Sequence, residues 1–439
     1  TKAIERKLNA GVKKGIIWHT QGSGKTALAY YNVRFLTDYF QNQQVIPKFY
    51  FIVDRLDLLQ QAQREFTARG LIVHLIDSRE AFTRDIKASQ ALHNHHGKAE
   101  ITVVNIQKFR DDPDVVTTKD YDINIQRVYF LDEVHRSYNP KGSFLANLSQ
   151  SDTNAIKIGL TGTPLLGTDY NSRDLFGDYI HKYYYNASIA DGYTLRLIRE
   201  EIATNYRMIL QQALKDVEVR MGDVDRKYIY AHPSFVKPML NYIVTDFAKS
   251  RGALNDGTIG GMVICDSSEQ AKQMFELFNA DYAESPTVAD EVTDEMSVLQ
   301  AAEPAAVYQI HAKETRKIKR AALILHDSVS KQERKEWVEQ FKAGEIDLLF
   351  VYNMLLTGFD AKRLKKLYLG RVIRKHNLLQ ALTRVNRTYN HFRYGYVVDF
   401  ADIRQEFDAT NKAYFEELQA ELGDEMEHYS RLFKSAAEI

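Results

Sequence analysis

Short apolar runs alternate with longer segments of helical periodicity along most of the chain. In the first half, apolar runs that predict buried strands cover residues 15–18, 48–53, 72–76, 101–105, 127–131 and 156–160. Segments with the spacing of amphipathic helices cover residues 25–40, 56–67 and 78–93. Strands that are apolar throughout and alternate with helices predict a parallel sheet covered by helices on both faces.

The same alternation returns in the second half of the chain. Expected strands cover residues 262–266, 322–326, 347–351, 367–370 and 396–400. Expected helices cover residues 236–249, 267–279, 331–342 and 378–387. The predicted fold class is therefore α/β, with two tandem domains that each contain a mostly parallel sheet flanked by helices.

The pattern also predicts how the domains are divided. Residues 1–195 form the first domain, 196–231 a connector with a helix from about 198 to 219, and 232–401 the second domain. A stretch at about 281–312 is rich in Asp and Glu and lacks Lys and Arg, which is typical of a mobile surface insertion. Residues 402–439 are expected to begin a helical region, and residues 1–14 a helix cut from a longer protein.

Composition narrows the class of protein without naming its ligands. The 439 residues are 44% hydrophobic and 26% charged, which is ordinary for a soluble protein of two or three domains. No apolar run is long enough for a membrane span, and the single cysteine, Cys265, excludes an internal disulfide and fits a reducing cytosol. Lys plus Arg equals Asp plus Glu at 58 each, so any nucleic-acid surface must come from local segregation of charge.

A glycine-containing loop joins the first expected strand to the first expected helix, with the sequence His19-Thr20-Gln21-Gly22-Ser23-Gly24-Lys25-Thr26. The glycines let successive backbone N–H groups point at phosphate oxygens. In this context Lys25 would reach the β and γ phosphates of a nucleotide, and the Thr26 hydroxyl would bind Mg²⁺. His19 stands where the full phosphate-loop pattern has a glycine, so an ordinary strand–turn–helix is the alternative for this loop alone.

Two carboxylates, Asp132 and Glu133, end the apolar run 127–131. Parallel α/β sheets bind ligands at the carboxyl ends of their strands. Asp132 would hold Mg²⁺ through its water shell, Glu133 would orient and polarise the attacking water, and His135 would relay the γ-phosphate state to the neighbouring domain. A strand that ends in a charged turn is the alternative.

Thr161-Gly162-Thr163-Pro164 directly follows the expected strand 156–160. Hydroxyls of Thr161 and Thr163 on a stiff turn beside the acidic pair would couple the site to its substrate. A plain β-turn explains the same four residues equally well.

Two arginines, Arg384 and Arg387, lie three residues apart on the expected helix 378–387 and would share one helix face. They predict either a solvated face or arginine fingers, side chains that reach from the second domain to the γ-phosphate. A finger of this kind increases the turnover rate by about 10³- to 10⁵-fold.

Taken in order, these motifs resemble those of superfamily 2 helicases. The set is the phosphate loop, Asp132-Glu133-Val134-His135, Thr161-Gly162-Thr163-Pro164, Thr357-Gly358-Phe359-Asp360 and the Gln380, Arg384, Arg387 motif. More narrowly, the loop, Val53-Asp54-Arg55, Asp132 to Ser137 and Arg384-Val385-Asn386-Arg387 are similar to the motor part of the restriction subunit of type I restriction enzymes, over residues 4–403. The resemblance implies two RecA-like domains that hydrolyse ATP with Mg²⁺ and translocate double-stranded DNA.

The resemblance also assigns roles that the residues alone do not. It implies that Gly358 and Asp360 bind nucleotide and that Gln380 couples the site to movement. It implies DNA-backbone contacts from Arg55, Gln107, Lys108, Ser267, Ser268 and Thr357. Backbone contacts without base contacts suit a motor that ignores sequence. The implied partners are methyltransferase and sequence-specificity subunits, in the cytoplasm of a bacterium or archaeon.

The chain departs from the family pattern in several places. Val134 replaces the alanine of Asp-Glu-Ala-His, and the adenine-reading glutamine and the nuclease set Asp…Glu-x-Lys are expected upstream of Thr1. Glu5-Arg6-Lys7 and Glu333-Arg334-Lys335 spell Glu-x-Lys, but both lie on expected helices and are interpreted as solvated faces. The chain is therefore expected to bind DNA without cutting it.

Two further clusters have competing interpretations. The basic cluster either attracts DNA or forms a solvated face, and consists of Lys362, Arg363, Lys365, Lys366, Arg371, Arg374 and Lys375. The histidines His93, His95 and His96 favour a flexible loop over a metal site, because no cysteine or carboxylate partner is nearby.

Two other functions compete with the motor. One is a different superfamily 2 enzyme, an RNA helicase or a remodeller, which the response of the ATPase to duplex DNA and to RNA would separate. The other is a nucleotide-gated scaffold that does not hydrolyse ATP. Lys25, Glu133 and Arg387 together argue against the scaffold, because it needs no hydrolytic residues.

Overall fold

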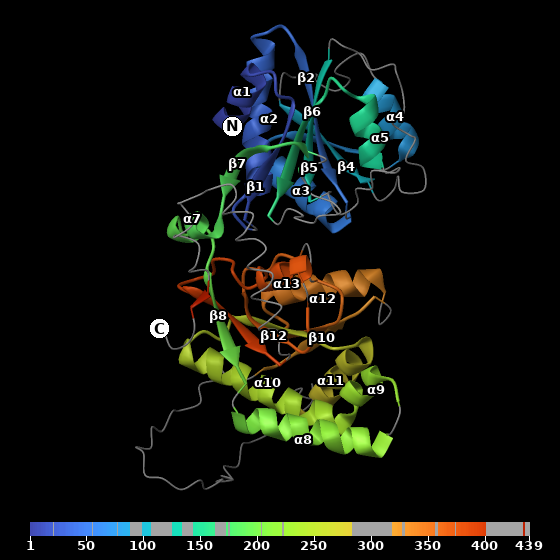
Figure 1. Ribbon diagram of the computed structural model, residues 1–439, viewed down its shortest axis with the longest axis vertical. Helices are drawn as coiled ribbons and strands as arrows, with labels where there is room; N and C mark the ends of the chain where they lie inside the picture. The colour runs from blue at the N-terminus through green and yellow to red at the C-terminus, as the bar shows by residue number, and fades with distance from the viewer. Residues whose placement is uncertain are drawn as a thin grey trace. The chain divides into compact units, whose positions relative to one another are not determined.

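Two seven-stranded sheets organise the structure, a computed structural model (Figure 1). It describes residues 1–20, 22–54, 56–76, 78–87, 99–106, 125–133, 144–162, 173, 176–202, 204–221, 224–282, 318–326, 330–355, 359–373, 375–400 and 433–434. The described residues fall into two compact units, the first comprising 1–194 and 378–383, the second 195–377, 384–400 and 433–434.

The first unit contains a parallel sheet with the strand order β3-β4-β2-β5-β6-β1-β7. Its strands are β1 (Lys14–His19), β2 (Ile46–Val53), β3 (Ile72–Ile76), β4 (Glu100–Asn105), β5 (Ile125–Asp132), β6 (Ile156–Thr161) and β7 (Tyr179–Tyr183). Its helices are α1 (Lys2–Asn9), α2 (Lys25–Gln41), α3 (Leu56–Ala68), α4 (Arg79–Lys87), α5 (Phe144–Ser151) and α7 (Tyr185–Ala190).

Both faces of this sheet are buried, because neighbouring residues of the central strands enter different cores. On β2, Phe51 packs with Val33 of α2 and Phe66 of α3. The next residue, Ile52, packs with Phe82 of α4 and Phe144 of α5 in the other core. In Figure 1, α2 and α5 accordingly lie on opposite sides of the sheet. An apolar strand with no polar face needs this double cover.

The second unit repeats the parallel sheet with the order β10-β11-β9-β12-β13-β8-β14. Its strands are β8 (Arg196–Glu201), β9 (Gly260–Ile264), β10 (Ala321–Ile324), β11 (Leu348–Val351), β12 (Leu364–Leu369), β13 (Tyr394–Asp399) and β14 (Phe433–Lys434). The helices of this part of the chain are α8 (Thr204–Met221), α9 (Arg226–Ala231), α10 (Pro233–Ala253), α11 (Ser268–Asp281), α12 (Lys331–Ala343) and α13 (Lys375–Leu382).

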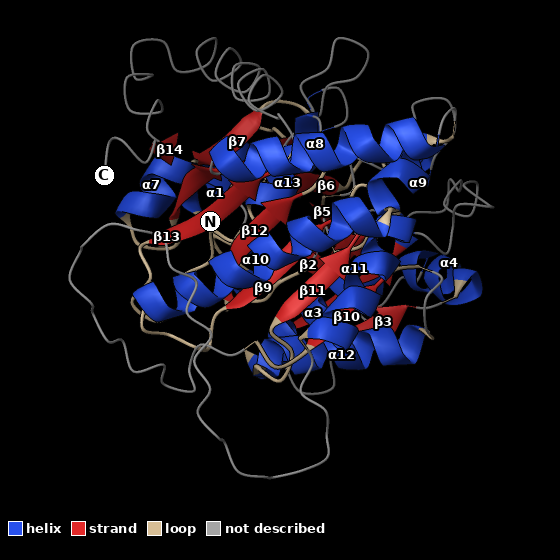
Figure 2. Ribbon diagram, turned by 90° about the horizontal axis from the view of Figure 1, so that it is seen from below, coloured by secondary structure: helices blue, strands red, loops and turns tan. Residues whose placement is uncertain are grey.

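A single large core on one face of the second sheet holds α10 and α11 in place. Phe247 of α10 and Phe278 of α11 pack with Val263, Phe350 and Tyr368 of three neighbouring strands. Figure 2 shows both helices laid over these strands. The predicted α/β class with two RecA-like sheets is thus confirmed.

The expected helix at about 198–219 is wrong at its start, because residues 196–201 form strand β8 and the helix begins at Thr204. β8 pairs with β13 from Arg196 opposite Tyr394 to Glu201 opposite Asp399, and the Arg199 guanidinium lies 2.5 Å from the Asp399 carboxylate. A charged strand of this kind has no apolar run for sequence reasoning to detect. β8 therefore belongs to the second sheet and not to a connector.

The remaining expectations concern individual helices, the two Glu-x-Lys sequences, the acidic insertion and the end of the chain. The first helix is observed as α1, and the expected helix 78–93 is observed from Arg79 to Lys87 as α4, while residues 88–93 lie outside the described residues. Both Glu-x-Lys sequences lie on helices as expected, and Glu333 forms a capping box with Ser330. Residues 283–317, most of 401–439 and the three histidines lie outside the described residues. Among the described helices, none is long and apolar enough to cross a membrane.

Candidate nucleotide-binding site

The candidate site lies at the carboxyl ends of three adjacent strands of the first unit. β5, β6 and β1 are neighbours in the parallel sheet, so their carboxyl ends meet at the same edge. Lys25 follows β1, Glu133 follows β5, and Thr161 ends β6. The fold therefore brings together three motifs that are distant in the sequence, at the edge where parallel α/β sheets bind ligands.

The phosphate loop takes a backbone path that requires glycine. Gly22 and Gly24 have φ angles of 87° and 88°, in the left-handed region that side chains disfavour. Gly24 is the N-cap of α2, and Ser23 Oγ donates to the Thr20 carbonyl over 2.7 Å. The loop thus delivers the free amides at the N-terminus of α2 to the sheet edge, and such amides form a ready site for phosphate.

Glu133 is fixed in a single orientation by four contacts. Its φ angle is 53°, uncommon for a residue with a side chain, and its N–H donates to the Leu160 carbonyl over 2.9 Å. Thr161 Oγ1 donates to Oε2 over 2.8 Å, and the Gly162 N–H donates to Oε1 over 2.8 Å. Lys25 Nζ lies 3.5 Å from the same Oε1. A strained backbone held by several bonds is typical of a functional position.

Asp132 is a buried carboxylate whose surroundings fit a cation. Burial raises its pKa from 3.8 to about 7; nearby Lys25 lowers this pKa, while the Glu133 and Asp54 carboxylates raise it. Within the part of the chain that the structure describes, its Oδ1 is buried without a hydrogen-bond partner. A buried carboxylate oxygen normally has a hydrogen-bond donor or an ion as its partner, so this oxygen fits a bound cation.

The small number of metal ligands among the described residues fits a Mg²⁺ ion that is bound together with a nucleotide. No group of three His, Cys, Asp or Glu side chains in the described ranges could hold a metal ion. Mg²⁺ is usually held by one or two protein groups together with phosphates and water. Asp132 and Thr26, the second residue of α2, are the residues that would supply those groups.

His19, which replaces a glycine of the full pattern, packs against the edge strand β7. Its Nε2 lies 2.9 Å from Nδ1 of His181, and the two rings meet edge to face. The pKa of His19 is lowered to about 3, mainly by burial and also by the nearby His181 and Lys25. His19 is therefore neutral at neutral pH and adds no charge to the phosphate loop.

Sequence reasoning missed several contributors to this site. The sequence assigned no role to the Gly162 N–H or to the Asp54 carboxylate, which acts on Asp132. Strand β7, which carries His181, was not predicted. Asp54 follows Val53, which pairs with Asp132 across the sheet. A polar residue directly after a buried strand was the signal that could have identified it.

In the second unit, the two predicted fingers differ in environment. Arg387 Nε lies 3.5 Å from Asp360 Oδ1, and the Arg387 side chain is 19% exposed. Arg384 is 5% exposed, and its Nη1 donates to the Phe359 carbonyl over 2.5 Å. Both arginines thus contact the segment that carries the expected nucleotide-binding residue Asp360.

The prediction that Arg384 and Arg387 share a helix face is wrong, because α13 ends at Leu382. The chain beyond it is held by other elements: the Leu195 N–H donates to the Asn386 carbonyl over 2.6 Å. Gly395 of β13 lies so close that an added Cβ would be 2.2 Å from the Val385 carbonyl oxygen. Tertiary contacts therefore override the helical spacing.

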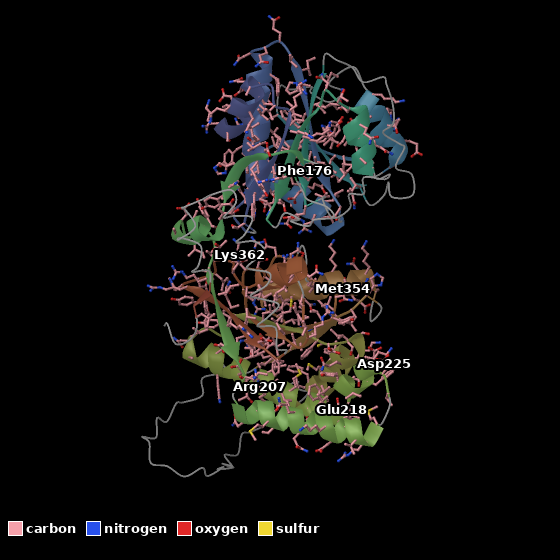
Figure 3. The ribbon with its side chains drawn as sticks, viewed as in Figure 1. Phe176, Arg207, Glu218, Asp225, Met354 and Lys362 are labelled. Carbon is pink, nitrogen blue, oxygen red and sulfur yellow. The ribbon has the colours of Figure 1, made fainter. Side chains whose placement is uncertain are left out.

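Three members of the basic cluster are buried, which contradicts both interpretations for those three residues. Arg363, Lys365 and Lys366 are at most 4% exposed and point into the second unit. Lys366 pairs with Glu200 at 2.7 Å and with Asp246 at 2.8 Å. Lys362, labelled in Figure 3, is exposed. The number of charges along a strand does not show that internal partners hold them, such as Glu200 and Asp246 for Lys366.

The remaining predicted residues are partly described. Ser267 caps α11 by accepting from the Gln270 N–H over 3.1 Å, Ser268 Oγ donates to Glu269 over 3.0 Å, and Gln380 is buried on α13. The predicted residues that lie outside the described ranges are Gln21, Arg55, Gln107, Lys108, His135, Thr163, Thr357 and Gly358, together with Arg374 of the basic cluster.

Comparison with known families matches both parts of the chain. Residues 1–227 match the model of the SWI2/SNF2 ATPase family, and residues 258–402 match the model of type I restriction enzyme subunit R domain 3. Among solved structures, the ATP-dependent Type ISP restriction-modification enzyme LlaBIII bound to DNA has a TM-score of 0.57 at 11% identity, covering 90% of this chain and 26% of that one. That likeness shows a shared fold.

Two curated relatives match most of the chain. The type I restriction enzyme SauCOLORF180P endonuclease subunit of Staphylococcus aureus strain COL is 26% identical over 417 residues, which is 90% of this chain and 42% of the relative. The type I restriction enzyme HindI endonuclease subunit of Haemophilus influenzae is 26% identical over 427 residues, 91% of this chain and 38% of the relative. The chain thus spans about two fifths of the length of these relatives.

Proposed function

The chain belongs to the SWI2/SNF2 ATPase family, and from this we propose that it is an ATP-dependent motor that translocates double-stranded DNA. The observation that carries the proposal is the convergence of Lys25, Thr161 and Gly162 on the Glu133 carboxylate. A cation and a fixed carboxylate beside a phosphate loop supply the parts that phosphoryl transfer to water requires.

Each part has a role in hydrolysis. The loop from Thr20 to Thr26 binds the phosphates, and Lys25 neutralises their charge. Glu133, held by the Thr161 hydroxyl and the Gly162 N–H, orients and polarises the attacking water. Thr26 and Asp132 would hold Mg²⁺, which would supply positive charge at the phosphate oxygens. Thr161 couples the acidic pair to the β6 turn, and we assign His135 and Thr163 to the same coupling.

We propose that residues 1–195 act as one motor domain and that residues 232–401, together with strand β8, act as the other. Arg387 of the second domain is the arginine finger, because its guanidinium is partly exposed and pairs with one carboxylate. Arg384 supports the segment that carries Asp360 through its hydrogen bond to the Phe359 carbonyl. Gly358 and Asp360 contact the nucleotide, and Gln380 couples the nucleotide site to movement. Closure of the domains on ATP would bring the finger to the γ-phosphate.

The relatives support a place for this motor within a larger enzyme. Curated relatives are named endonuclease subunits of type I restriction enzymes. We propose that this chain is the motor part of such a subunit, pulling duplex DNA before cleavage, with methyltransferase and specificity subunits as partners. Arg55, Gln107, Lys108, Ser267, Ser268 and Thr357 would hold the DNA backbone, in the cytoplasm of a bacterium or archaeon.

An ATPase assay with duplex DNA, single strands and RNA side by side tests the proposal. ATP turnover stimulated most by duplex DNA, and lost in Glu133→Gln with ATP binding retained, is the expected result. Stimulation by RNA alone would instead indicate an RNA helicase. ATP binding without turnover under every condition would indicate a nucleotide-gated scaffold.

A further inference from the structure

Lys365 is a buried lysine that contacts the backbone of the proposed finger. It is the second residue of β12 and is 0% exposed. Its Nζ donates to the carbonyl oxygen of Arg387 in a short hydrogen bond. Burying an ammonium group is costly unless it is paired, so this contact requires an explanation.

An irregularity of the strand aims this side chain. The pairing of β12 with β9 shifts between Leu364, opposite Gly260, and Lys366, opposite Gly261, so Lys365 is the extra residue of a bulge. Bulges redirect a side chain and are common next to active sites. Lys366 follows directly and pairs instead with Glu200 and Asp246. Two adjacent buried lysines thus have separate partners.

The Lys365 ammonium contacts the Arg387 carbonyl and lies near the Tyr389 ring, and the Asp360 carboxylate acts on its charge. The Tyr389 ring centroid lies 6.0 Å from Nζ, and Asp360 also pairs with Arg387 Nε at 3.5 Å. The pKa of Lys365 is lowered to about 7, mainly by burial; the charge of Arg387 also lowers it, and Asp360 raises it. Asp360 therefore pairs with Arg387 and also acts electrostatically on Lys365.

We propose that Lys365 is a positioning residue for Arg387. Its ammonium fixes the Arg387 carbonyl, and so the start of the finger, while its charge competes for Asp360 and weakens the hold of that carboxylate on the guanidinium. The Arg387 backbone is then held in place, while the Arg387 guanidinium is free to leave Asp360 for the phosphate. This role rests on the proposed function, in which Arg387 stabilises the transition state.

The proposal predicts a loss of turnover without a loss of ATP binding. Lys365→Met keeps the buried stem but removes the donor and the charge. We expect kcat with saturating duplex DNA to fall about 10- to 100-fold, as for a misplaced catalytic group, with the KM for ATP nearly unchanged. The wild-type kcat falls as pH rises through about 7, since Lys365 then loses its proton, and this limb is absent in Lys365→Met. Lys365→Gln, which keeps an uncharged donor, falls between the two.

Controls separate this role from a structural one. Lys366→Met removes an equally buried lysine of the same strand and should lower thermal stability while keeping kcat and the pH limb. Combined with Arg387→Ala, Lys365→Met should cause no further loss, because both act through one side chain.

The outcomes distinguish the two levels of the proposal. Normal kcat and an unchanged pH profile in folded Lys365→Met, with turnover lost in Arg387→Ala, would overturn the role of Lys365 alone. Normal turnover in Arg387→Ala would overturn the finger assignment and the role of Lys365 with it. A loss in Lys366→Met equal to that in Lys365→Met would show that Lys365 acts only through the stability of the second unit.

Discussion

The Nζ of Lys25 lies 3.5 Å from Oε1 of Glu133, so the proposed phosphate-binding lysine and the proposed water-orienting carboxylate form an ion pair. Both side chains are mostly buried, at 12% and 16% exposed. A phosphate that reaches the loop competes with Glu133 for this ammonium. Nucleotide binding should therefore loosen Glu133 from Lys25 and leave it on Thr161 and Gly162, ready to orient water.

Replacing Lys25 with alanine should abolish ATP turnover and leave the fold intact. The side chain ends at a sheet edge rather than in either core, so its removal opens no core cavity. Thermal unfolding and DNA-stimulated ATPase measured on the same preparation check this prediction. Normal hydrolysis in the folded variant would disprove the phosphate-loop assignment.

Replacing Thr161 with valine should lower kcat without changing ATP affinity. Valine has the same shape but cannot donate to Glu133 Oε2, so the carboxylate loses one of the two donors that orient it. We expect a fall of about 10- to 100-fold, since misorientation of a catalytic group has effects of this size. Thr161→Ser, which keeps the hydroxyl, is the matched control and should retain most of the turnover. Equal loss in both variants would show that keeping the hydroxyl is not sufficient, and would contradict its role as the deciding donor.

Arg387→Ala should reduce turnover by about 10³- to 10⁵-fold, because a finger neutralises charge in the transition state. ATP affinity should change much less. Arg387→Lys should rescue poorly, since lysine keeps the charge but loses the planar fork. Arg393→Ala removes an exposed arginine elsewhere in the same unit and should have little effect. Measured kcat and nucleotide affinity for all three variants test the assignment; near-normal kinetics in Arg387→Ala would indicate a solvated side chain.

The free energy of unfolding should depend on pH through Lys365. Its pKa falls from 10.5 in the unfolded chain to about 7 in the folded protein, so the unfolded chain binds more protons between these values. Stability from this group therefore rises with pH in that window, by up to about 1.4 kcal/mol per pH unit, and is constant below it. Denaturant unfolding of wild type and Lys365→Met from pH 6 to 10 measures the difference. A difference that does not vary with pH would contradict the burial of a titrating lysine.

The order of motifs was sufficient to predict the two parallel sheets and the family. Apolar runs mark strands buried on both faces, and the loop from His19 to Thr26 needs its glycines for local reasons. The predicted resemblance to type I restriction subunits within superfamily 2 is confirmed. That Asp132 and Glu133 lie at the same sheet edge as Lys25 also followed from the sequence, because the carboxyl ends of parallel strands share an edge.

What the sequence could not determine are the features set by contacts between distant residues. Arg384 and Arg387 have helical spacing, yet backbone contacts with Leu195 and Gly395 end the helix before them. Lys365 and Lys366 are adjacent residues of the same type, and a bulge in β12 gives each a different partner. Local spacing determines which elements can form. Packing of one strand against another determines where each helix ends and which charges are buried, because those free energies arise only when the sheet is assembled.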